Sequence, residues 1–502
     1  MQPFVSIILP VRNEANYIIP CLRSIAAQDY PKDLMELLIV DGRSNDSTAL
    51  KIEEFRIQNS EFRIHLIDNP ARTVPHAMNL GIAAAKGDII LRFDGHAVMA
   101  PDYVSNCVKY LEQTKADNVG GPAINISNGT AIGDAILISH NSAFGLGGGA
   151  FRMGNFEGFA DTVTFGCYPK ETFAKYGRYD TRLTRNQDIE FNARIRKGII
   201  KRTADSGQRD QFKVESLKLK EGPDSSDSKA GSSPQNDENE LKEKNFVPLC
   251  LGGKKPEKEE NDLRKSAQSA DREAPGKIYL TPKIKSYYYC RNTLRGLWSQ
   301  NFRNGQWVVY TKYIAPYALS LRHFIPLLFV TTILFLIIAS LISLKSSTGS
   351  TGLMGSTAAS LSQVFELSTF NFQLTALRLL LLVLGVYFGT MLIAVMQAGW
   401  RQYKVYKVHK AESKTQDGDA KAPGTINSEH STLELSNFKT VLGAKASDEG
   451  FNTKYQIPNT EYRIRSLLLL PIVFMTLHFS YGLGSIWGLV SLPYWAAKQQ
   501  KR

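Results

Sequence analysis

The sequence predicts an α/β domain with a mainly parallel sheet, followed by interfacial helices and about three transmembrane helices. Short apolar runs alternate with helical patterns over the first 200 residues, which is typical of a sheet built from β–α units. Acidic residues follow several of these runs, and long uncharged segments occupy the second half of the chain. With 502 residues and a formal charge of +13, the chain is long enough for more than one domain.

The first two expected strands each lead into polar residues. A strand over residues 4–9 is followed by the segment PVRNE and then by a helix over about 15–27. The second strand, residues 36–40, ends at Asp41. Ligands of open α/β sheets bind at the C-terminal ends of the strands, where a carboxylate can accept the imide N–H of a uracil or contact a ribose. Asp41 is therefore a candidate nucleotide-binding residue.

A further strand, residues 89–93, ends in the triplet Asp94-Gly95-His96. A hard carboxylate beside a borderline imidazole suits Mn²⁺ or Mg²⁺, of which Mn²⁺ tolerates nitrogen better. Such an ion would act as a Lewis acid on a departing diphosphate. The pattern makes Asp94 and His96 candidate metal ligands.

Asp188 stands at the start of a helix expected to run to about Lys197. The helix dipole favours an ionised carboxylate at this end, and a general base must be ionised. The same side chain could instead cap the helix, and the residues alone leave both interpretations open.

Three long apolar segments predict membrane helices. Residues 324–344 carry no charge, residues 377–398 are broken only by Arg378, and residues 466–493 contain one histidine and several glycines. About 20 apolar residues in a helix cross a hydrocarbon core of roughly 30 Å. The third segment either spans the membrane or re-enters it.

Residues 287–321, before the first apolar segment, mix aromatic and basic side chains. Nucleic-acid binding is one interpretation of such a mixture. The neighbouring span favours interfacial helices that contact membrane lipid, with no nucleic-acid partner.

Two segments, 201–275 and 411–458, are rich in Lys, Glu, Asp, Ser and Gly and poor in aromatic residues. Such compositions bury too little apolar area to fold, so both are expected to be disordered. Gly198 reads as the C-cap of a helix before the first segment, and a strand is expected over 276–282 after it. The first segment is therefore predicted to be an insertion into one domain.

The N-terminus and the cysteines bear on location. No basic region precedes the first strand as it would in a signal peptide, so the N-terminal domain is expected in the cytoplasm. The basic segment 401–410 is then also expected inside. The five cysteines include no C-x-x-C pair, which predicts reduced thiols and no zinc site.

In combination, these motifs resemble glycosyltransferase family 2 over residues 1–200. The matching motifs are PVRNE (10–14), V-D-G-x-S-x-D-x-T (40–48), R-T-V-x-x-A-x-N-x-G-I (72–82), D-G-H (94–96) and N-Q-D-I-E-x-N-x-R (186–194). Residues 140–152, 165–168 and 475–482 resemble the succinoglycan-biosynthesis subgroup of membrane glycosyltransferases. The resemblance implies a GT-A fold, the nucleotide-diphospho-sugar transferase fold.

The resemblance also implies an activity. It is the inverting transfer of a single hexose from a nucleotide-sugar, expected to be a UDP-sugar, to a lipid-linked or glycan acceptor in exopolysaccharide or cell-surface glycan synthesis. The family's catalytic base matches Asp188, although Gln187 replaces the family's glutamate. The nucleotide-sugar positions carry over to Pro10, Arg12, Glu14, Asp41, Arg72 and Asp94. Metal binding of Mn²⁺ or Mg²⁺ carries over to Asp94 and His96, where the commoner pattern has a second Asp in place of His96.

Processive polysaccharide synthases of this superfamily carry Q-x-x-R-W after the catalytic domain. Here Gln300 and Arg303 are present, Asn304 stands in place of the tryptophan, and Trp307 follows three residues later. This departure favours transfer of a single sugar, with Gln300, Arg303 and Trp307 expected at the acceptor side or the membrane interface.

The alternatives are a polyprenyl-phosphate sugar synthase, a processive polysaccharide synthase and a non-enzymatic membrane scaffold. Retention of Asp41, Asp94 and Asp188 speaks against the scaffold. The expected location is the inner membrane, as a multi-pass protein with a cytoplasmic catalytic domain. The predicted organisation is a GT-A domain (1–200), a disordered insertion (201–275), the end of the domain with interfacial helices (276–320), two transmembrane helices (321–400), a basic and then disordered cytoplasmic loop (401–460), and a third membrane segment with a basic tail (461–502).

Overall fold

A computed structural model describes most of the N-terminal α/β region and the apolar helices. The described residues are 2–127, 129–146, 156–200, 274–347, 358–416 and 460–500. The predicted disordered segments, 201–275 and 411–458, lie almost wholly outside these residues, as does Cys250.

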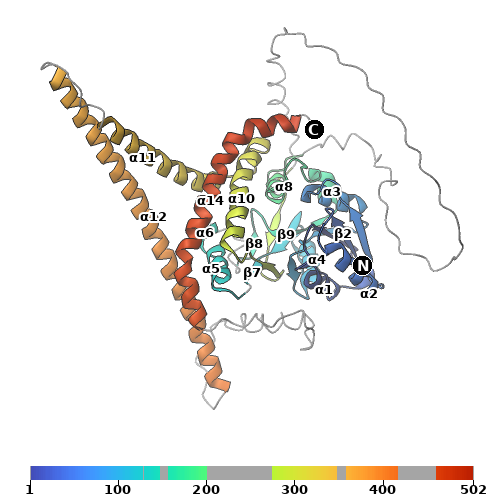
Figure 1. The fold of residues 1–502 in the computed structure, drawn as a ribbon. Coiled ribbons are helices and arrows are strands. Elements are labelled where there is room, and N and C mark those ends of the chain that lie inside the picture. Colours follow the sequence, from blue (N-terminus) through green and yellow to red (C-terminus); the bar gives the residue numbers. More distant parts are fainter. Residues whose placement is uncertain are drawn as a thin grey trace, which may run out of the picture.

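The centre of the globular part is a mixed sheet with the strand order β3-β2-β1-β4-β9-β6-β10-β8 (Figure 1). Its strands are β1 (Val5–Val11), β2 (Met35–Asp41), β3 (Ile64–Asp68), β4 (Ile89–Arg92), β6 (Asn118–Gly121), β8 (Gly158–Phe159), β9 (Thr164–Pro169) and β10 (Ile278–Leu280). Strands β1, β2, β3 and β4 pair in parallel, whereas β9 runs antiparallel to β4 and β6. The C-terminal ends of β1, β2 and β4 therefore meet at one edge.

Both faces of the sheet are covered by helices, which explains the nearly unbroken apolar runs. Val5, Ile7 and Leu9 of β1 face one buried cluster, and Ile8 faces the other, because side chains alternate along a strand. The first face packs against α1 (Ile18–Ala26), α2 (Thr48–Gln58) and α4 (Tyr103–Thr114). The second packs against α3 (Val74–Ala84), α7 (Glu171–Tyr176) and α8 (Gln187–Arg196).

A small second sheet has the order β5-β11-β7, formed by β5 (Ala97–Met99), β11 (Ser286–Tyr289) and β7 (Ala123–Ile126). The prediction of interfacial helices from residue 287 is wrong at its start, because Tyr287–Tyr289 belong to β11. Tyrosine favours strands, and β11 gains pairing partners on both sides. The expected helix follows as α10 (Leu294–Ile314), with the Thr293 hydroxyl accepting from Gly296 N as its N-cap.

The flanks of the predicted insertion meet in this domain. Gly198 has the positive φ of a helix C-cap, 61°, and its N–H donates to Ile195 O at 3.0 Å. Gly276 N donates to the same carbonyl at 2.9 Å, and β10 then pairs in parallel with β6. The chain before and after residues 201–273 thus contributes to one sheet.

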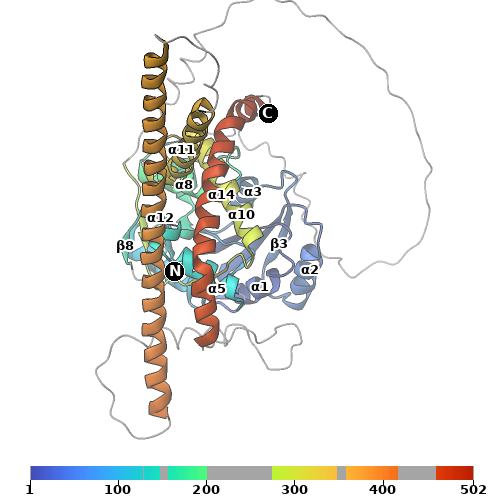
Figure 2. The same cartoon turned by 60° about the vertical axis from the view of Figure 1, so that its left-hand side comes forward.

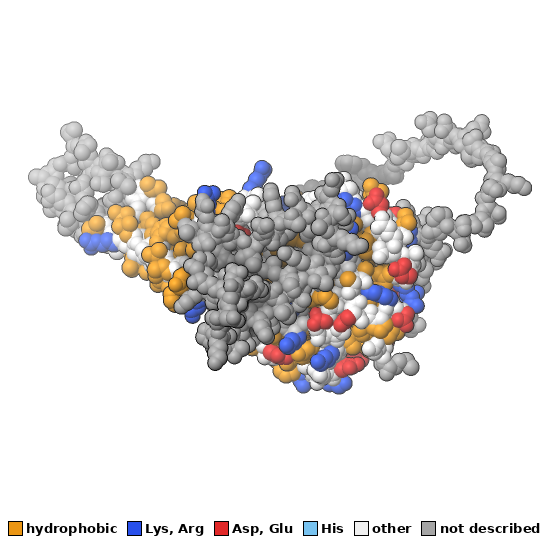
Figure 3. All heavy atoms as spheres, turned by 90° about the horizontal axis from the view of Figure 1, so that it is seen from below, with side chains coloured by type: hydrophobic (Ala, Val, Ile, Leu, Met, Phe, Trp, Pro, Cys, Tyr) orange, Lys and Arg blue, Asp and Glu red, His pale blue; other side chains and the backbone are white. Residues whose placement is uncertain are grey.

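In the part of the chain that the structure describes, three helices are long and apolar enough to cross a membrane. They are α11 (Ile325–Ser347), α12 (Ala358–Gln416) and α14 (Thr460–Gln500). The apolar segments are Leu321–Leu341, which begins in the short 3-10 helix before α11, Leu374–Lys404 and Arg465–Gln499. Many large apolar side chains of α11 and α12 are exposed, such as Phe335 and Leu382. Figure 3 shows them gathered along the projecting helices, whereas charged side chains gather on the globular part.

Helices α10 and α14 lie side by side (Figures 1 and 2) with their backbones in close approach. A Cβ at Gly305 would lie 2.0 Å from Tyr481 O, and one at Gly484 would lie 2.0 Å from Phe302 O. Ser485 Oγ donates to Gly305 O at 3.1 Å. The catalytic region is therefore joined to an apolar helix through small residues, as in membrane helix packing.

A second junction involves α5 (Ala131–His140) and α6 (Ala143–Leu146), which pack on α14. His478 Nε2 of α14 donates to Phe144 O at 2.8 Å, and Tyr387 of α12 reaches His478 Nδ1 at 3.0 Å. The Phe144 ring meets the rings of Phe474, His478 and Tyr387. The histidine of the third apolar segment, His478, thus links α14 to α6 and α12.

Replacing Gly305 with alanine should weaken the junction of α10 and α14, because its Cβ would meet the Tyr481 carbonyl. We expect a loss of about 1–3 kcal/mol in the free energy of unfolding. Gly389→Ala on α12 is the matched control, since nothing lies within 4 Å of its Cβ position. Denaturant unfolding in detergent would measure both, and equal effects would contradict the close approach.

Shortening the predicted insertion should preserve the fold, because Gly276 and Ile195 are already hydrogen-bonded across it. We expect a variant in which a few glycines join Ile200 to Gly276 to insert into membranes and unfold at a similar denaturant concentration. Each halving of a loop changes the closure free energy by only about 0.6 kcal/mol. Loss of cooperative unfolding in this variant would show that the removed residues contribute to the fold.

Candidate active site

The predicted nucleotide-binding residues gather at the C-terminal ends of β1 and β2. Val11 and Asp41 are direct neighbours in the parallel register, and Gly42 N donates to Val11 O at 2.8 Å. A Cβ at Gly42 would lie 3.3 Å from Arg12 Cδ and 3.4 Å from Arg72 Cα. Gly42 therefore lets Arg12 and Arg72 approach Asp41. Pro10 pairs with Val40 one step further back in the sheet.

Hydrogen bonds fix the loops around Asp41. Its Oδ1 accepts from Ser44 Oγ at 2.6 Å, and its carbonyl accepts from Asn69 N at 2.8 Å. Arg72, which donates its N–H to Asn69 O at 3.0 Å, has a left-handed φ of 59°. Left-handed backbone is uncommon outside glycine and is frequent at ligand sites. The turn chemistry of two loops thus positions one arginine beside the Asp41 strand end.

Glu14 and His96 form a bridge between loops. His96 Nδ1 lies 3.0 Å from Glu14 Oε1, and His96 Nε2 lies 3.2 Å from the Tyr288 hydroxyl of β11. Burial acts to lower the pKa of His96, but the hydrogen bond and charge of Glu14, with the charge of Asp94, outweigh it and raise that pKa. Both ring nitrogens of His96 are occupied by protein groups.

Asp94 and Asp188 lie on either side of one buried guanidinium. Arg92 Nη2 donates to Asp94 Oδ1 at 3.2 Å, and Arg92 Nη1 lies 3.6 Å from Asp188 Oδ2. Burial acts to lower the pKa of Arg92, but the two carboxylates outweigh it and raise that pKa, so the group stays charged. The side chain of Arg92 is 9% exposed and that of Asp188 is 43% exposed, which leaves Asp188 open to an incoming molecule.

The start of α8 is held by α10. Asn186 precedes the helix with a left-handed φ of 60°, and its Nδ2 donates to Thr311 Oγ1 at 3.2 Å. Arg185 Nη1 donates to Asn304 Oδ1 at 2.9 Å. Asp188 lies in the first turn, where the helix dipole favours a negative charge. The direction of Asp188 therefore depends on contacts with α10.

The three predicted acceptor-side residues all lie on α10 but differ in their surroundings. Gln300 is partly buried and its Oε1 has no hydrogen-bond partner within the described part of the chain, while Arg303 is exposed. Burial and the charges of Arg303 and Arg291 lower the pKa of Arg185, so these three cations lie near the start of α8. Trp307 instead packs against Tyr310 and against Trp495 of α14.

Asp94 suits a divalent cation better than His96 does in this arrangement. Asp94 Oδ1 contacts Arg92, and among the described residues Oδ2 makes no hydrogen bond. Mg²⁺ is often bound by one or two carboxylates together with substrate phosphates. No group of three or more His, Cys, Asp or Glu within the described part of the chain is placed to hold a metal. A cation here would rest on Asp94 and on the ligand's own oxygens.

Sequence reasoning missed Arg92, Arg185, Asn304 and Tyr288. Arg92 had a signal, because it is a charge inside the apolar run of residues 89–93. The other residues carry no local signal, since their partners lie far away in sequence.

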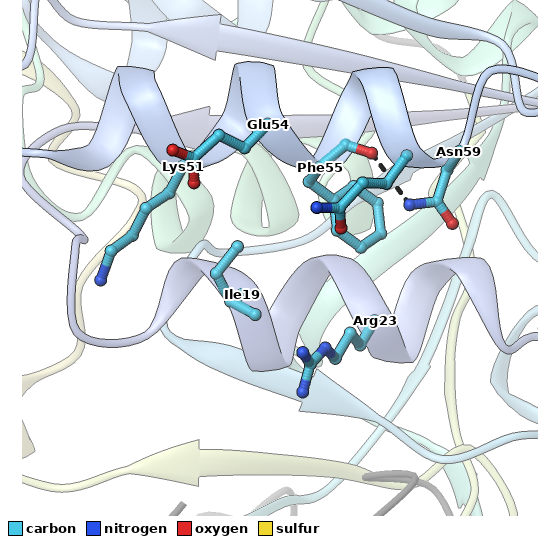
Figure 4. Close-up of a pocket in the computed structure, with 7 residues that line it drawn as sticks. Ile19, Arg23, Lys51, Glu54, Phe55 and Asn59 are labelled. Atoms are coloured by element: carbon cyan, nitrogen blue, oxygen red, sulfur yellow. Dashed lines mark hydrogen bonds between the residues drawn. The ribbon is translucent and has the colours of Figure 1, made fainter. Parts of the chain in front are cut away.

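A separate pocket lies between α1 and α2 (Figure 4). It has a volume of about 390 Å³ and is lined by Ile19, Arg23, Lys51, Glu54, Phe55, Gln58 and Asn59. It contains none of the predicted site residues, so it is distinct from the edge of the sheet that carries Asp41 and Asp94.

Residues 6–155 match the family model described as glycosyl transferase family 2. This part of the chain is a glycosyltransferase family 2 domain. Its fold is GT-A, as the resemblance implied, and the match covers Arg12, Asp41, Arg72 and Asp94 but ends before Asp188.

Two curated archaeal relatives are similar to the N-terminal region. One is a dolichyl N-acetyl-α-D-glucosaminyl phosphate 3-β-D-2,3-diacetamido-2,3-dideoxy-β-D-glucuronosyltransferase of Methanococcus voltae, 32% identical over 198 residues, which are 38% of this chain and 61% of the relative. The other is the glycosyltransferase AglE of Haloferax volcanii, 35% identical over 119 residues, which are 24% of this chain and 39% of the relative. The chain thus spans less than two thirds of either relative.

Among solved structures, the mannosyltransferase PcManGT from Pyrobaculum calidifontis, in complex with GDP-mannose and Mn²⁺, is 16% identical with a TM-score of 0.39. That similarity covers 77% of this chain and 87% of the other. The match does not extend to the particular subgroup of succinoglycan biosynthesis, which stays a prediction.

Proposed function

We propose that this protein is an inverting glycosyltransferase that moves a single hexose from a UDP-sugar to a lipid-linked or glycan acceptor in exopolysaccharide or cell-surface glycan synthesis. One observation carries the proposal. The half-exposed carboxylate of Asp188 and the carboxylate of Asp94 both contact the buried guanidinium of Arg92. They lie at the edge of the sheet that also carries Asp41. A base and a donor-binding edge side by side are what a single displacement needs.

In this mechanism Asp188 accepts the proton of an acceptor hydroxyl. The acceptor oxygen then attacks the anomeric carbon from the side opposite the nucleoside diphosphate, whose bond to that carbon breaks, so the configuration inverts. Asp188 is suited to this role because it sits at a helix N-terminus and beside Arg92.

We assign nucleotide binding to residues at one edge of the sheet, namely Pro10, Arg12, Asp41 and Arg72. Glu14 stabilises the loop after β1 through its hydrogen bond with His96. Asp94 would hold Mn²⁺ or Mg²⁺, whose chemistry is to neutralise charge on the departing diphosphate. The occupied ring nitrogens favour a linking role for His96 over the metal-ligand role that the sequence predicted.

The membrane-side helices support a lipid-linked acceptor. Asn304 and Thr311 of α10 contact the residues just before the base, and α10 lies against the apolar helix α14. The relative from Methanococcus voltae, by its name, acts on a dolichyl-linked sugar phosphate. We place Gln300 and Arg303 on the acceptor side, with the globular domain on the cytoplasmic face of the inner membrane.

The same helix favours transfer of one sugar over processive synthesis. Asn304 occupies the place of the processive enzymes' tryptophan and hydrogen-bonds Arg185. Trp307 is engaged with Trp495 and Tyr310. Asn304 is not aromatic and the Trp307 ring is already packed, so neither side chain is available to stack on a growing polysaccharide.

Asp188→Asn should lower turnover by roughly 10²–10⁴-fold, the usual contribution of a general base, while UDP binding stays intact. Release of UDP from a panel of UDP-sugars with membrane-lipid acceptors measures the first, and calorimetry measures the second. Glu171→Gln is the control, since Glu171 is likewise an acidic residue in the first turn of a helix, α7, and lies outside the site. Near-normal turnover of Asp188→Asn would remove the base assignment.

Chelation with EDTA should abolish transfer, and Mn²⁺ or Mg²⁺ should restore it, because the diphosphate leaves with concentrated negative charge. In Asp94→Asn, the gain in UDP affinity on adding Mn²⁺ should disappear, whereas UDP affinity without metal should change little. Calorimetry with and without Mn²⁺ distinguishes these effects. Full turnover in EDTA would contradict the proposed role of Asp94.

A further inference from the structure

Arg92 occupies an unusual place for a charged side chain. It ends β4 directly after three buried apolar residues, and its Cα pairs with Ile8 of the central strand β1. The side chain is 9% exposed, and its Nε is buried without a hydrogen-bond partner among the residues that the structure describes. A buried cation is tolerated when carboxylates compensate its charge.

The two terminal nitrogens of Arg92 contact different carboxylates. Nη2 contacts Asp94 on its own loop, and Nη1 contacts Asp188 on α8. A guanidinium presents its donors in a fixed planar fork, so the two carboxylates are held at a set separation. A lysine ammonium is a point charge and cannot hold two partners in this way.

The folding of α8 does not rest on this contact. The helix is anchored by Arg194, which is wholly buried, donates to both carboxylate oxygens of Glu190 and donates to Tyr176 O at 2.7 Å. Arg92 acts only on the first turn, at the half-exposed Asp188.

We propose that Arg92 is a positioning residue, which fixes the carboxylate of the base Asp188 relative to the donor-side carboxylate Asp94. This inference rests on the proposed function. Without the guanidinium, Asp188 would keep its place on α8 and the hydrogen bond that its Oδ1 accepts from Ile189 N at 2.9 Å, but its Oδ2 would lose the contact that ties it to the Asp94 side. A displacement of about 1 Å in a reacting group can cost about 10²-fold in rate.

Arg92→Lys tests the proposal because it keeps the positive charge and loses the fork. We expect turnover to fall roughly 10–100-fold, with the KM for the UDP-sugar and the affinity for UDP without added metal within about threefold of the unaltered protein. Arg196→Lys is the matched control on the same helix, since Arg196 pairs with Asp161 at the exposed far end. It should leave turnover unchanged.

The decisive measurement is the same substitution in the Asp188→Asn background, with single-turnover transfer from a radiolabelled UDP-sugar. If Arg92 acts through Asp188, adding Arg92→Lys should lower the residual rate by less than about threefold, because effects of coupled residues do not multiply. An equal fold-loss in both backgrounds would overturn the proposal.

Two further outcomes would also overturn it. One is normal turnover of Arg92→Lys while Asp188→Asn is impaired, which leaves the proposed function standing. The other is a parallel fall in UDP affinity and melting temperature, as we expect for Arg194→Lys, which would make Arg92 a purely structural residue. Normal turnover of Asp188→Asn would instead contradict the proposed function itself.

Discussion

The arrangement of the site depends on one buried positive charge at the end of β4. The guanidinium of Arg92 is removed from water by the sheet and by the helices on its face, and an uncompensated charge there would cost several kcal/mol. Asp94 and Asp188 compensate this charge. The loop after β4 and the first turn of α8 therefore both lie next to the guanidinium of Arg92. Two carboxylates from distant parts of the chain are thereby brought to one edge of the sheet.

A second set of contacts links that edge to the apolar helices. Helix α10 accepts hydrogen bonds from Arg185 and Asn186, the residues just before the start of α8, and it also packs against α14 through Gly305. Because α10 makes both contacts, the position of the proposed base Asp188 and the packing of the apolar helices both depend on α10. The junction of His478 with Phe144 adds a second point of attachment to the domain.

The elements that carry the site could be predicted because their signals are local. The apolar run before Asp41 is buried on both faces, and the Gly198 C-cap marks the end of α8. The contacts that orient the side chains could not be predicted. Arg185 and Asn304 lie 119 residues apart in sequence, and His96 and Tyr288 lie 192 residues apart. The sequence predicted His96 as a metal ligand, and only the folded arrangement shows that protein groups contact both of its ring nitrogens.

The donor side and the acceptor side therefore differ in what determines them. Asp41, Gly42 and Arg72 are placed by strand ends and by the turns that follow them, all within the first 100 residues. Asp188 lies two residues after Asn186, whose left-handed conformation costs of order 1 kcal/mol and is held by the hydrogen bond that Asn186 Nδ2 donates to Thr311 Oγ1 of α10. The proposed nucleotide-binding residues are thus placed by the sheet and its turns, whereas the residues that precede the proposed base are held by α10, which packs against α14. The position proposed for the base therefore depends on contacts between the globular domain and α10, the helix that also packs against the apolar helix α14.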